Sequence, residues 1–448
     1  MTGLNDLLTH INGYLWGVPM IVLLLGTHIY LTIRLKFPQR YIFKAIRLSV
    51  KRDKESTGDV SQFSALATSL AGTIGTGNII GVATAVTMGG PGAVFWCWMT
   101  GVLGIATKYA EGLLAVKYRV QTEDGKMLGG PMYALERGLG CRWLGWTFAF
   151  CTIVASFFIG NMIQCNSISM LLEEGYHISP FATGITIALL TCAVIMFGVK
   201  GIARVCEGLV PFMAVFYVGG CLWLLGVNHA YVWPALRLIV TDAFTPQAAT
   251  GGFVGASMMI AMRYGIARGL FSNESGLGSA PIVAAAARTK NPVRQALVSS
   301  TSPFWDTVVI CAITGLVLVS SIMANPEIDS SAGATLTKVA FGQIPTFGPF
   351  VLTMGIVTFS FSTILGWSYL GEKALEYLFG RRARIVYRVL WIAATFIGSI
   401  TAINLVWNLG DTCNALMAIP NIISLLLLSG VVVKETRHYL WEKRLDEE

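Results

Sequence analysis

Long apolar runs, each bounded by charged or turn-forming residues, recur along the whole chain of 448 residues. A helix needs about 20 apolar residues to cross the hydrocarbon core of a bilayer. Runs of about that length predict eleven helices, at 12–33, 61–88, 91–117, 146–172, 181–198, 205–228, 252–287, 296–323, 347–372, 387–405 and 408–433. The segments between them are too short for a catalytic domain outside the membrane. We therefore expect an all-α, polytopic membrane protein with a single transmembrane domain.

The composition indicates the same class of protein. Hydrophobic residues make up 54% of the chain and charged residues only 12%, whereas soluble domains carry about a quarter charged residues. The mean hydropathy is +0.65. The net charge of +8 does not indicate a nucleic-acid partner, because the charges lie at the ends of apolar runs, as membrane topology requires. The expected surroundings are the lipid bilayer.

Cysteines and histidines form no reactive group in the sequence. The nine cysteines are scattered singly without a C-x-x-C pair, and no two of the five histidines have the spacing of metal ligands. An enzyme within the membrane would need a nucleophile–base pair or a metal constellation. The sequence offers neither, so no enzymatic activity is expected.

The distribution of Lys and Arg predicts the orientation in the membrane. With the N-terminus outside, the inner connections hold 27 basic residues and the outer connections hold 2. Cytoplasmic loops carry such an excess, so a multi-pass protein of the plasma membrane with its C-terminus in the cytoplasm is predicted. No Lys or Arg precedes Arg34, so the run 12–33 is expected to be a retained helix rather than a cleaved signal peptide.

Two spans contain glycine-rich, polar runs. Residues 71–78 read AGTIGTGN and residues 269–278 read GLFSNESGLG. Each glycine weakens a helix by about 1 kcal/mol relative to alanine, and non-helical backbone at membrane depth persists only where it is buried or lines a cavity. Both spans are therefore predicted to be broken helices. The alternative is that the glycines serve close helix packing, but packing alone does not explain Asn78, Asn273 and Glu274.

Each broken span opens a block of five predicted helices. The blocks cover residues 61–228 and 252–433, and the two broken spans run in opposite directions through the membrane. The run 12–33 then stands as one extra N-terminal helix. A broken helix at the same place in two oppositely oriented halves is typical of transporters built from inverted repeats.

Four segments in and between these spans resemble the alanine or glycine:cation symporter family. They read AGTIGTGNIIGV (71–82), GGPMYALERGL (129–139), GNMIQCNSI (160–168) and GLFSNESGLGSAPI (269–282). The resemblance implies sodium-coupled symport of small neutral amino acids, alanine or glycine, into the cell by alternating access. It also implies the five-plus-five inverted-repeat fold of the bacterial leucine transporter behind one extra helix.

Alternatives to this function stay open at the level of sequence. An ion channel would also place polar residues at mid-membrane, but it would conduct without saturable uptake of a solute. Protons or lithium instead of sodium as coupling ion, and a related amino acid such as glutamine as substrate, are further alternatives.

The resemblance to the leucine-transporter fold assigns a substrate site to the two breaks. The amides of Thr76 and Gly77 would hold the substrate carboxylate, because free N–H groups at the positive end of a half-helix suit an anion. Phe271 would wall the substrate side chain. Asn273 is more polar than its counterpart in that fold, which leaves a direct contact with substrate or ion open.

A first sodium site is implied at the same breaks. Its ligands would be the side chain of Asn78, the carbonyl of Thr73 and the hydroxyl of Ser272. No ligand in this set carries a formal charge.

A second sodium site would join the first broken span to the span 347–372. The carbonyls of Ala71 and Ile74 would meet the carbonyl of Phe359 and the hydroxyls of Ser362 and Thr363. The last three are spaced i, i+3, i+4, which places them on one helix face. None of the five can titrate near neutral pH, which speaks against a proton. The alternative is that the hydroxyls bond back to carbonyls of their own helix.

The span 146–172 carries polar residues at helical spacing. Gly160, Asn161 and Gln164 lie on one face, and a pocket there would be small because Gly160 has no side chain. Such a pocket favours alanine and glycine as substrates. A polar contact between helices is the alternative.

Ionisable residues within the membrane are functional candidates by default. Glu111 resembles the carboxylate that accepts backbone N–H groups of the second broken helix, so we expect it to support that break. Asp411 and Arg263 could form an outer gate, although Asp411 could equally be solvated at the interface. The basic segment 40–54 is either an amphipathic helix on the inner leaflet or an ordinary inner loop.

Overall fold

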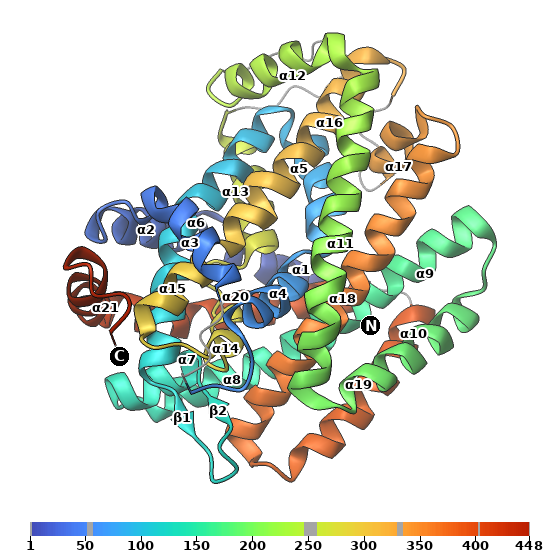
Figure 1. Cartoon of the computed structure of the whole chain (residues 1–448). Coiled ribbons are helices and arrows are strands. Elements are labelled where there is room, and N and C mark those ends of the chain that lie inside the picture. Colours follow the sequence, from blue (N-terminus) through green and yellow to red (C-terminus); the bar gives the residue numbers. More distant parts are fainter. Residues whose placement is uncertain (1, 52–56, 246–257, 329–334, 402–403, 448) are drawn as a thin grey trace.

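The computed structural model describes residues 2–51, 57–245, 258–328, 335–401 and 404–447 (Figure 1). The N-terminal part consists of α1 (Thr2–Leu15), α2 (Val18–Arg34), η1 (Pro38–Tyr41) and α3 (Ile42–Val50). The first block contains α4 (Gln62–Thr73), η2 (Gly77–Gly81), α5 (Val82–Gly89), α6 (Gly92–Lys117), β1 (Val120–Gln121), β2 (Met127–Leu128), α7 (Pro131–Tyr133), η3 (Ala134–Gly138), α8 (Arg142–Phe157), η4 (Phe158–Met162), α9 (Ile163–Tyr176), α10 (Pro180–Ile195), α11 (Gly198–Val227) and α12 (His229–Asp242).

The described part of the second block also consists mainly of helices. It contains α13 (Met258–Asn273), α14 (Ala280–Ala284), α15 (Pro292–Ser300), η5 (Phe304–Cys311), α16 (Ala312–Ala324), α17 (Thr335–Gly342), α18 (Phe347–Phe379), α19 (Ala383–Ile400), α20 (Asn404–Leu427), α21 (Ser429–Thr436) and η6 (Arg437–Trp441). The strands β1 and β2 form a two-stranded antiparallel hairpin at the end of α6.

The helices agree with the predicted all-α membrane fold. Within the described residues, seven helices are long and apolar enough to cross a membrane, or eight when the bent pair of α4 with η2 and α5 counts as one span. Helical structure lies in each of the eleven predicted ranges, but the number of crossings stays a prediction. The repeat boundaries also stay a prediction, and residues 252–257 lie outside the described part.

Both glycine-rich runs interrupt their helices, as predicted. The helix α4 ends at Thr73, and the chain turns by 53° before it continues at Gly77. The helix α13 ends at Asn273, and Glu274, Gly276 and Gly278 follow with positive φ of 53°, 89° and 88° before α14 begins. Glycine adopts this left-handed backbone without a steric penalty, which explains two of the glycines in the second run.

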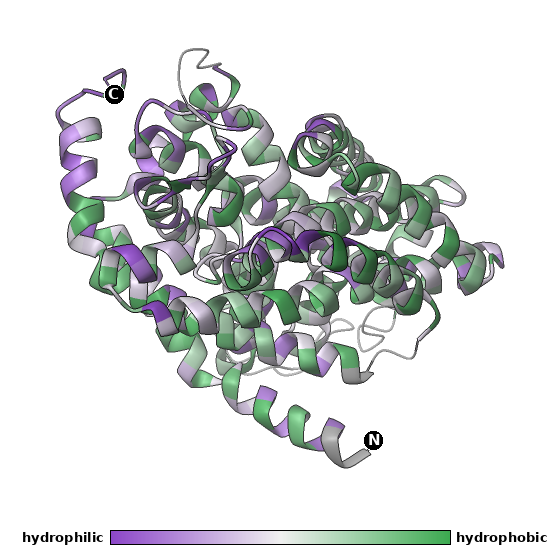
Figure 2. Cartoon of the chain, turned by 90° about the horizontal axis from the view of Figure 1, so that it is seen from below, coloured by the Kyte–Doolittle hydropathy of each residue, from purple (hydrophilic) through white to green (hydrophobic). Residues whose placement is uncertain are grey.

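The long helix α18 lies at the centre of the packing and contacts α4, α8, α9 and α11. The largest of its buried side chains is Trp367, which is fully enclosed. Around this core, α10, α11 and α19 expose large apolar side chains such as Leu189, Val215 and Val389. Figure 2 shows hydrophilic residues gathered along the C-terminal segment, while hydrophobic residues predominate on most other helices. Apolar outer faces are what a protein surrounded by lipid needs.

Candidate functional site

The first break is held open by its own side chain. The Oδ1 atom of Asn78 accepts a hydrogen bond of 2.9 Å from the amide of Gly75, which the interrupted helix leaves without its usual partner. The Nδ2 atom of Asn78 donates to Asp306 in η5, at 2.8 Å to Oδ1 and 3.1 Å to the carbonyl. The break is thereby tied to the second block.

Asp306 is the functional candidate that the sequence analysis missed. Its Oδ2 accepts hydrogen bonds from the hydroxyl of Ser272 at 2.9 Å and from that of Thr307 at 2.7 Å. The side chain is fully buried, and among the described residues no Lys or Arg nitrogen lies within ion-pair distance of it. A buried carboxylate without a positive partner is costly. Asp306 therefore places a carboxyl group, without a cationic partner among the described residues, between Asn78 and Ser272, the two side chains of the predicted first sodium site.

The predicted substrate residues of the first break lie together. The amide of Thr76 faces Oε1 of Gln164 at 3.4 Å, and Nε2 of Gln164 donates to the hydroxyl of Thr76 at 3.3 Å. A Cβ atom placed on Gly77 would lie 3.3 Å from the ring of Phe271. The ring of Phe271 in turn lies 6.2 Å from that of Trp407, measured between centroids.

Asn273 does not join this group. Its Oδ1 accepts a hydrogen bond of 3.0 Å from the amide of Ser275, and its Nδ2 donates to the hydroxyl of Thr100 in α6 at 3.2 Å. The side chain thus stabilises the unwound backbone of the second break and its contact with α6. The structure gives no support to a direct contact with substrate.

The space beside Gly160 is occupied by the indole ring of Trp367 and is not an open pocket. A Cβ atom on Gly160 would collide with the Cβ and Cγ atoms of Trp367 in α18, and Nε1 of Trp367 donates to the carbonyl of Gly72 at 3.2 Å. The predicted small space beside Gly160 is therefore filled by Trp367, whose position 207 residues further along the chain could not be derived from sequence spacing. Asn161 makes a contact between helices, with Nδ2 donating to the carbonyl of Trp391 at 2.9 Å.

The oxygens of the predicted second sodium site converge between α4 and α18. The hydroxyl of Thr363 lies 3.2 Å from the carbonyl oxygen of Ile74, and that of Ser362 lies 3.3 Å from that of Ala71. Both hydroxyls also reach the carbonyl of Phe359, at 2.9 and 2.8 Å respectively. The back-bonding that was the alternative interpretation is present, and it coexists with the contacts to α4.

Glu111 has the geometry predicted for a support of the second break. Its Oε1 accepts hydrogen bonds from the amide of Gly276 at 2.9 Å and from Nδ2 of Asn421 at 2.8 Å. Lys108 lies 3.7 Å from the other carboxylate oxygen and donates to the carbonyl of Glu274 at 3.1 Å. Unwound backbone groups at membrane depth thus find partners within the protein.

Arg263 and Asp411 form no ion pair in the described part of the structure, and the outer gate stays a prediction. Arg263 is exposed, and its guanidinium lies over the ring of Tyr264 at 5.7 Å. The charge that acts on Asp411 is that of Arg268, five residues further along α13. Residues three or four positions apart share a helix face, whereas residues five positions apart do not. Arg268 therefore faces α20, and Arg263 faces away from it.

A family model described as the sodium:alanine symporter family matches residues 1–448. The sodium/alanine symporter AgcS of Methanococcus maripaludis is 48% identical to this chain over 442 residues, which cover 97% of either chain. The chain belongs to the sodium:alanine symporter family. The probable sodium/glutamine symporter GlnT of Bacillus subtilis is 35% identical over 98% of this chain and 92% of its own length.

A solved structure supports the predicted fold. The crystal structure of MhsT in complex with L-phenylalanine aligns with a TM-score of 0.61 at 15% identity, over 86% of this chain and 95% of that chain. At that identity the likeness concerns the fold alone. The family and the leucine-transporter-like fold that the sequence predicts are thereby confirmed, and the protein is a multi-pass membrane symporter.

Backbone contacts join the two broken spans at the end of the protein that the sequence predicts to face the cytoplasm. The residues before α4 pair with those after α14: the amide of Asp59 donates to the carbonyl of Ala286 at 2.8 Å, and the amide of Arg288 donates to that of Val60 at 2.8 Å. Arg119 covers this junction, with Nη1 donating to the carbonyl of Ala287 at 2.9 Å. We call these residues, 57–60, 285–288 and Arg119, the inner latch.

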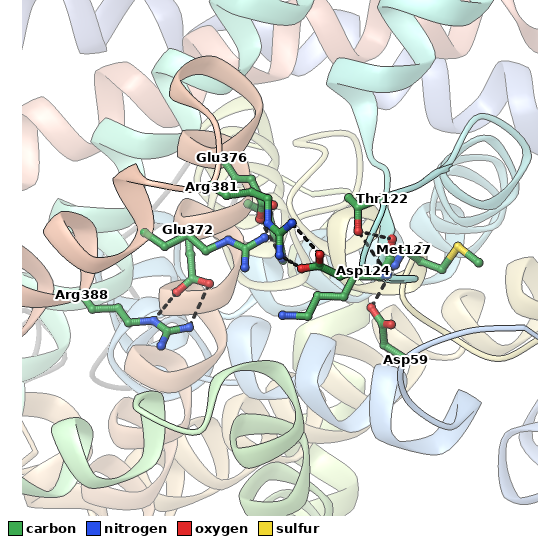
Figure 3. A network of polar contacts seen from close by, with 11 residues as sticks. Asp59, Thr122, Asp124, Met127, Glu372, Glu376, Arg381 and Arg388 are labelled. Atoms are coloured by element: carbon green, nitrogen blue, oxygen red, sulfur yellow. Dashed lines mark hydrogen bonds and ion pairs between the residues drawn. The ribbon is translucent and has the colours of Figure 1, made fainter.

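The hairpin β1–β2 connects the inner latch to α18 and α19 (Figure 3). The amide of Met127 donates to Oδ2 of Asp59 at 3.1 Å, and Asp124 forms an ion pair with Arg381. Beside it, Arg388 binds Glu372 through two nitrogens, at 2.7 and 3.1 Å. The hairpin thus lies between the latch and two ion pairs, Asp124 with Arg381 and Glu372 with Arg388.

Proposed function

We propose that the protein imports a small neutral amino acid, alanine or glycine, together with sodium. The observation that carries the proposal is the group of oxygens between α4 and α18. The carbonyls of Ala71 and Ile74 are released by the break, and the hydroxyls of Ser362 and Thr363 face them from α18. Oxygen ligands without charge suit a hard monovalent cation that must leave in each cycle, and an ion there would hold the two helices together.

The predicted first sodium site, which lies beside Asp306, would bind another sodium ion. Asn78 and Ser272 already donate hydrogen bonds to its carboxylate, so a cation entering beside it would meet the carboxylate and the hydroxyl oxygen of Ser272. The amide of Asn78 would join them by turning its Oδ1, which now accepts from Gly75, toward the ion. The carbonyl of Thr73, at the end of α4, completes this set. The charge of Asp306 attracts the ion to a buried place where neutral ligands alone would bind it weakly.

The substrate would lie between the first break and Phe271. Its carboxylate would accept hydrogen bonds from the amides of Thr76 and Gly77, and Gln164 is the neighbouring side chain that exchanges hydrogen bonds with Thr76. Phe271 bounds the space on one side, and the indole of Trp367 fills the space beside Gly160. So confined a place favours alanine and glycine over glutamine, which GlnT is named for.

The inward sodium gradient would set the direction of transport, and the predicted orientation says which end of the protein faces the cytoplasm. With the N-terminus outside, the inner latch and the ion pairs of Figure 3 lie on the cytoplasmic side of the plasma membrane. Opening of the latch would then release substrate and sodium into the cell. Since no step of this cycle forms or breaks a covalent bond, the proposed activity is transport and not catalysis.

The test is uptake of labelled alanine into liposomes that contain the purified protein. Saturable uptake driven by an inward sodium gradient, and abolished when sodium is equal on both sides, is the expected result. Uptake that follows a pH gradient in the absence of sodium would identify the proton as the coupling ion. Ion conductance without saturable uptake would indicate a channel. Labelled glycine and glutamine, offered as competitors, rank the substrates.

A further inference from the structure

A groove on the inner side lies between two parts of the chain that are far apart in sequence. One wall is formed by η1 and α3, and the other by η6 and the residues that follow it, around a cavity of about 600 Å³. The helix α3 packs against α15, and Arg294 of α15 binds Leu445 and Asp446 of the other wall. Its polar lining consists of Lys36, Arg40, Lys44, Lys51, Lys443 and Asp446. We call this place the basic groove.

The basic groove holds positive charge that the described part of the protein does not compensate. Its one carboxylate, Asp446, lies 2.7 Å from Nη1 of the buried Arg294 and 3.9 Å from Nζ of Lys51. The other four basic residues make no ion pair with a described residue. By contrast, Arg381 and Arg388 on the same inner side are paired with carboxylates. Several cations collected in one concavity repel one another and attract an anion.

Two of these cations are held in place by aromatic rings. The ammonium of Lys36 lies 4.5 Å from the centroid of Trp441, and the guanidinium of Arg40 lies 4.7 Å from that of Tyr41. Trp and Tyr prefer the level of the lipid headgroups. The rings thus place the cations at that level and reduce the freedom that they would lose on binding an anion.

The helix α3 presents the groove to the membrane. Ala45 and Ser49 are buried, and Lys44 and Lys51 line the groove on one flank. On the other flank, Phe43 and Val50 are 79% and 69% exposed. An amphipathic helix with basic residues beside exposed apolar ones lies in the interface, with the apolar side chains among the acyl chains.

We propose that the basic groove binds the headgroup of an acidic phospholipid. The phosphate would lie among Lys36, Arg40 and Lys44, and the acyl chains would follow Phe43 and Val50 into the bilayer. The adjacent apolar flank is the reason for a lipid in place of a soluble phosphate. Basic pockets at the cytoplasmic side of membrane helices bind such headgroups. A bound lipid would join α3 to the C-terminal segment across α15.

The test compares two variants of the full chain that lose the same charge. Lys36→Gln/Lys44→Gln/Lys443→Gln removes three cations of the groove, and the control Lys126→Gln/Lys200→Gln/Arg382→Gln removes three elsewhere on the predicted inner side. Delipidated protein in detergent is titrated with phosphatidylglycerol or phosphatidylcholine, and bound lipid is counted by native mass spectrometry. Each basic residue near a headgroup contributes about 1 kcal/mol, so we expect at least a tenfold loss of phosphatidylglycerol affinity in the groove variant.

The control variant should bind phosphatidylglycerol within about twofold of the wild type, and the wild type should prefer it to phosphatidylcholine. Equal losses in both variants, or no preference between the lipids, would overturn the proposal. Displacement of the lipid by millimolar inorganic phosphate would also overturn it, because it would identify a soluble anion as the ligand. If the triple variant does not fold, Lys44→Gln against Lys44→Arg makes the same comparison. None of these measurements depends on transport.

Discussion

Among single residues, Asp306 is the buried carboxyl group that contacts both Asn78 and Ser272 of the proposed first ion site. Three side chains donate hydrogen bonds to its carboxylate. Among the described residues, no Lys or Arg nitrogen lies within ion-pair distance of it. Neutral donors stabilise a buried carboxylate only in part. A sodium ion bound beside it would supply the missing charge, so ion binding and the state of Asp306 are coupled.

Asp306→Asn should weaken sodium binding while leaving the fold intact. The amide keeps the size of the side chain but removes the charge that attracts the ion, and a loss of about 1.4 kcal/mol corresponds to a tenfold change in affinity. We expect the sodium concentration for half-maximal alanine uptake to rise at least about tenfold. Asp242→Asn, which alters a carboxylate that accepts from the amide of Gly92 far from the proposed ion sites in sequence, is the control. Superimposable sodium curves for Asp306→Asn would remove Asp306 from the ion site.

Thr363→Ala tests the second group of oxygens. Loss of the hydroxyl removes one ligand of the proposed ion, so the half-saturating sodium concentration should rise about tenfold and saturating sodium should partly restore the rate. Thr358→Ala is matched to it, because the hydroxyl of Thr358 bonds only within α18, to the carbonyls of Met354 and Gly355. An equal shift in both variants would mean a general effect on α18 and not a lost ligand.

The resemblance and the helical spacing together point to the oxygens that converge between α4 and α18, whose role as a sodium site stays a prediction, but they do not point to Asp306 or Trp367. Phe359, Ser362 and Thr363 lie within five residues on one helix, so helical spacing alone places them on one face. Asp306 meets Asn78 from a position 228 residues away, and only the tertiary packing of η5 shows it. An acidic residue inside the predicted span 296–323 was nevertheless a signal, since charges at membrane depth are rare without a function.

At the scale of helices, the contact between α18 and the π-helical turn η4 sets the size of the proposed pocket. Gly160 is the position in η4 where the indole of Trp367 fits, because any side chain there would collide with it. Backbone and ring therefore approach more closely than two ordinary helices do. Substrate size is then limited by a pair of residues and not by Gly160 alone.

Trp367→Phe should widen the range of substrates. The smaller ring leaves space beside Gly160, so we expect glutamine to compete for alanine uptake more strongly than in the wild type, while Gly160→Ala alone should weaken alanine uptake. The double variant Gly160→Ala/Trp367→Phe should recover part of that loss, because the two residues are in contact. Trp391→Phe, a buried indole in α19, is the control. Unchanged competition by glutamine in Trp367→Phe would show that Trp367 does not bound the substrate.

At the scale of elements, the side chain of Arg119 holds the two parts of the inner latch together. Arg119 spans it, with hydrogen bonds to the carbonyls of Ala285 and Ala287 and to that of Thr57. Because Arg119 belongs to the first block's α6–β1 connection and Ala287 to the second block, its guanidinium resists separation of the two broken spans on the inner side.

Arg119→Ala should shift the symporter toward an inward-open state. Loss of three hydrogen bonds weakens the latch, and the amides of Asp59, Val60 and Arg288 should then exchange with deuterium faster, because their partners are latch carbonyls. Hydrogen exchange followed by mass spectrometry on peptides that cover 57–60 and 285–288 measures this. Lys117→Ala, which loses an exposed ion pair with Glu435, should leave exchange there unchanged. Equal exchange in Arg119→Ala and the wild type would mean that the backbone pairing closes this side without Arg119.

At the scale of the whole molecule, the two proposed ion sites and the latch act on one moving part. The first site joins the first break to η5, the second joins it to α18, and the latch joins its inner end to the second break. Occupation of both ion sites therefore stabilises arrangements in which α4 is held against the rest of the protein. Loss of the ions weakens two of these three attachments, which couples ion release to opening on the inner side.

Whether the latch opens toward the cytoplasm depends on the orientation of the chain in the membrane. This orientation can be tested independently of transport. The 27 basic residues of the predicted inner connections against 2 of the outer ones predict the C-terminus in the cytoplasm and the N-terminus outside. Fusion of alkaline phosphatase, which is active only outside the cytoplasm, to the C-terminus should give no activity. A fluorescent protein that matures in the cytoplasm should be bright at the same place. An epitope placed before residue 1 should be digested by protease added to spheroplasts, while one inserted at Gly125, in the turn of the hairpin β1–β2, should be protected. An active phosphatase at the C-terminus would reverse the orientation. In that case the inner latch and the basic groove would lie on the outer side, and opening of the latch would admit substrate and sodium from outside, while the inward sodium gradient would still drive uptake.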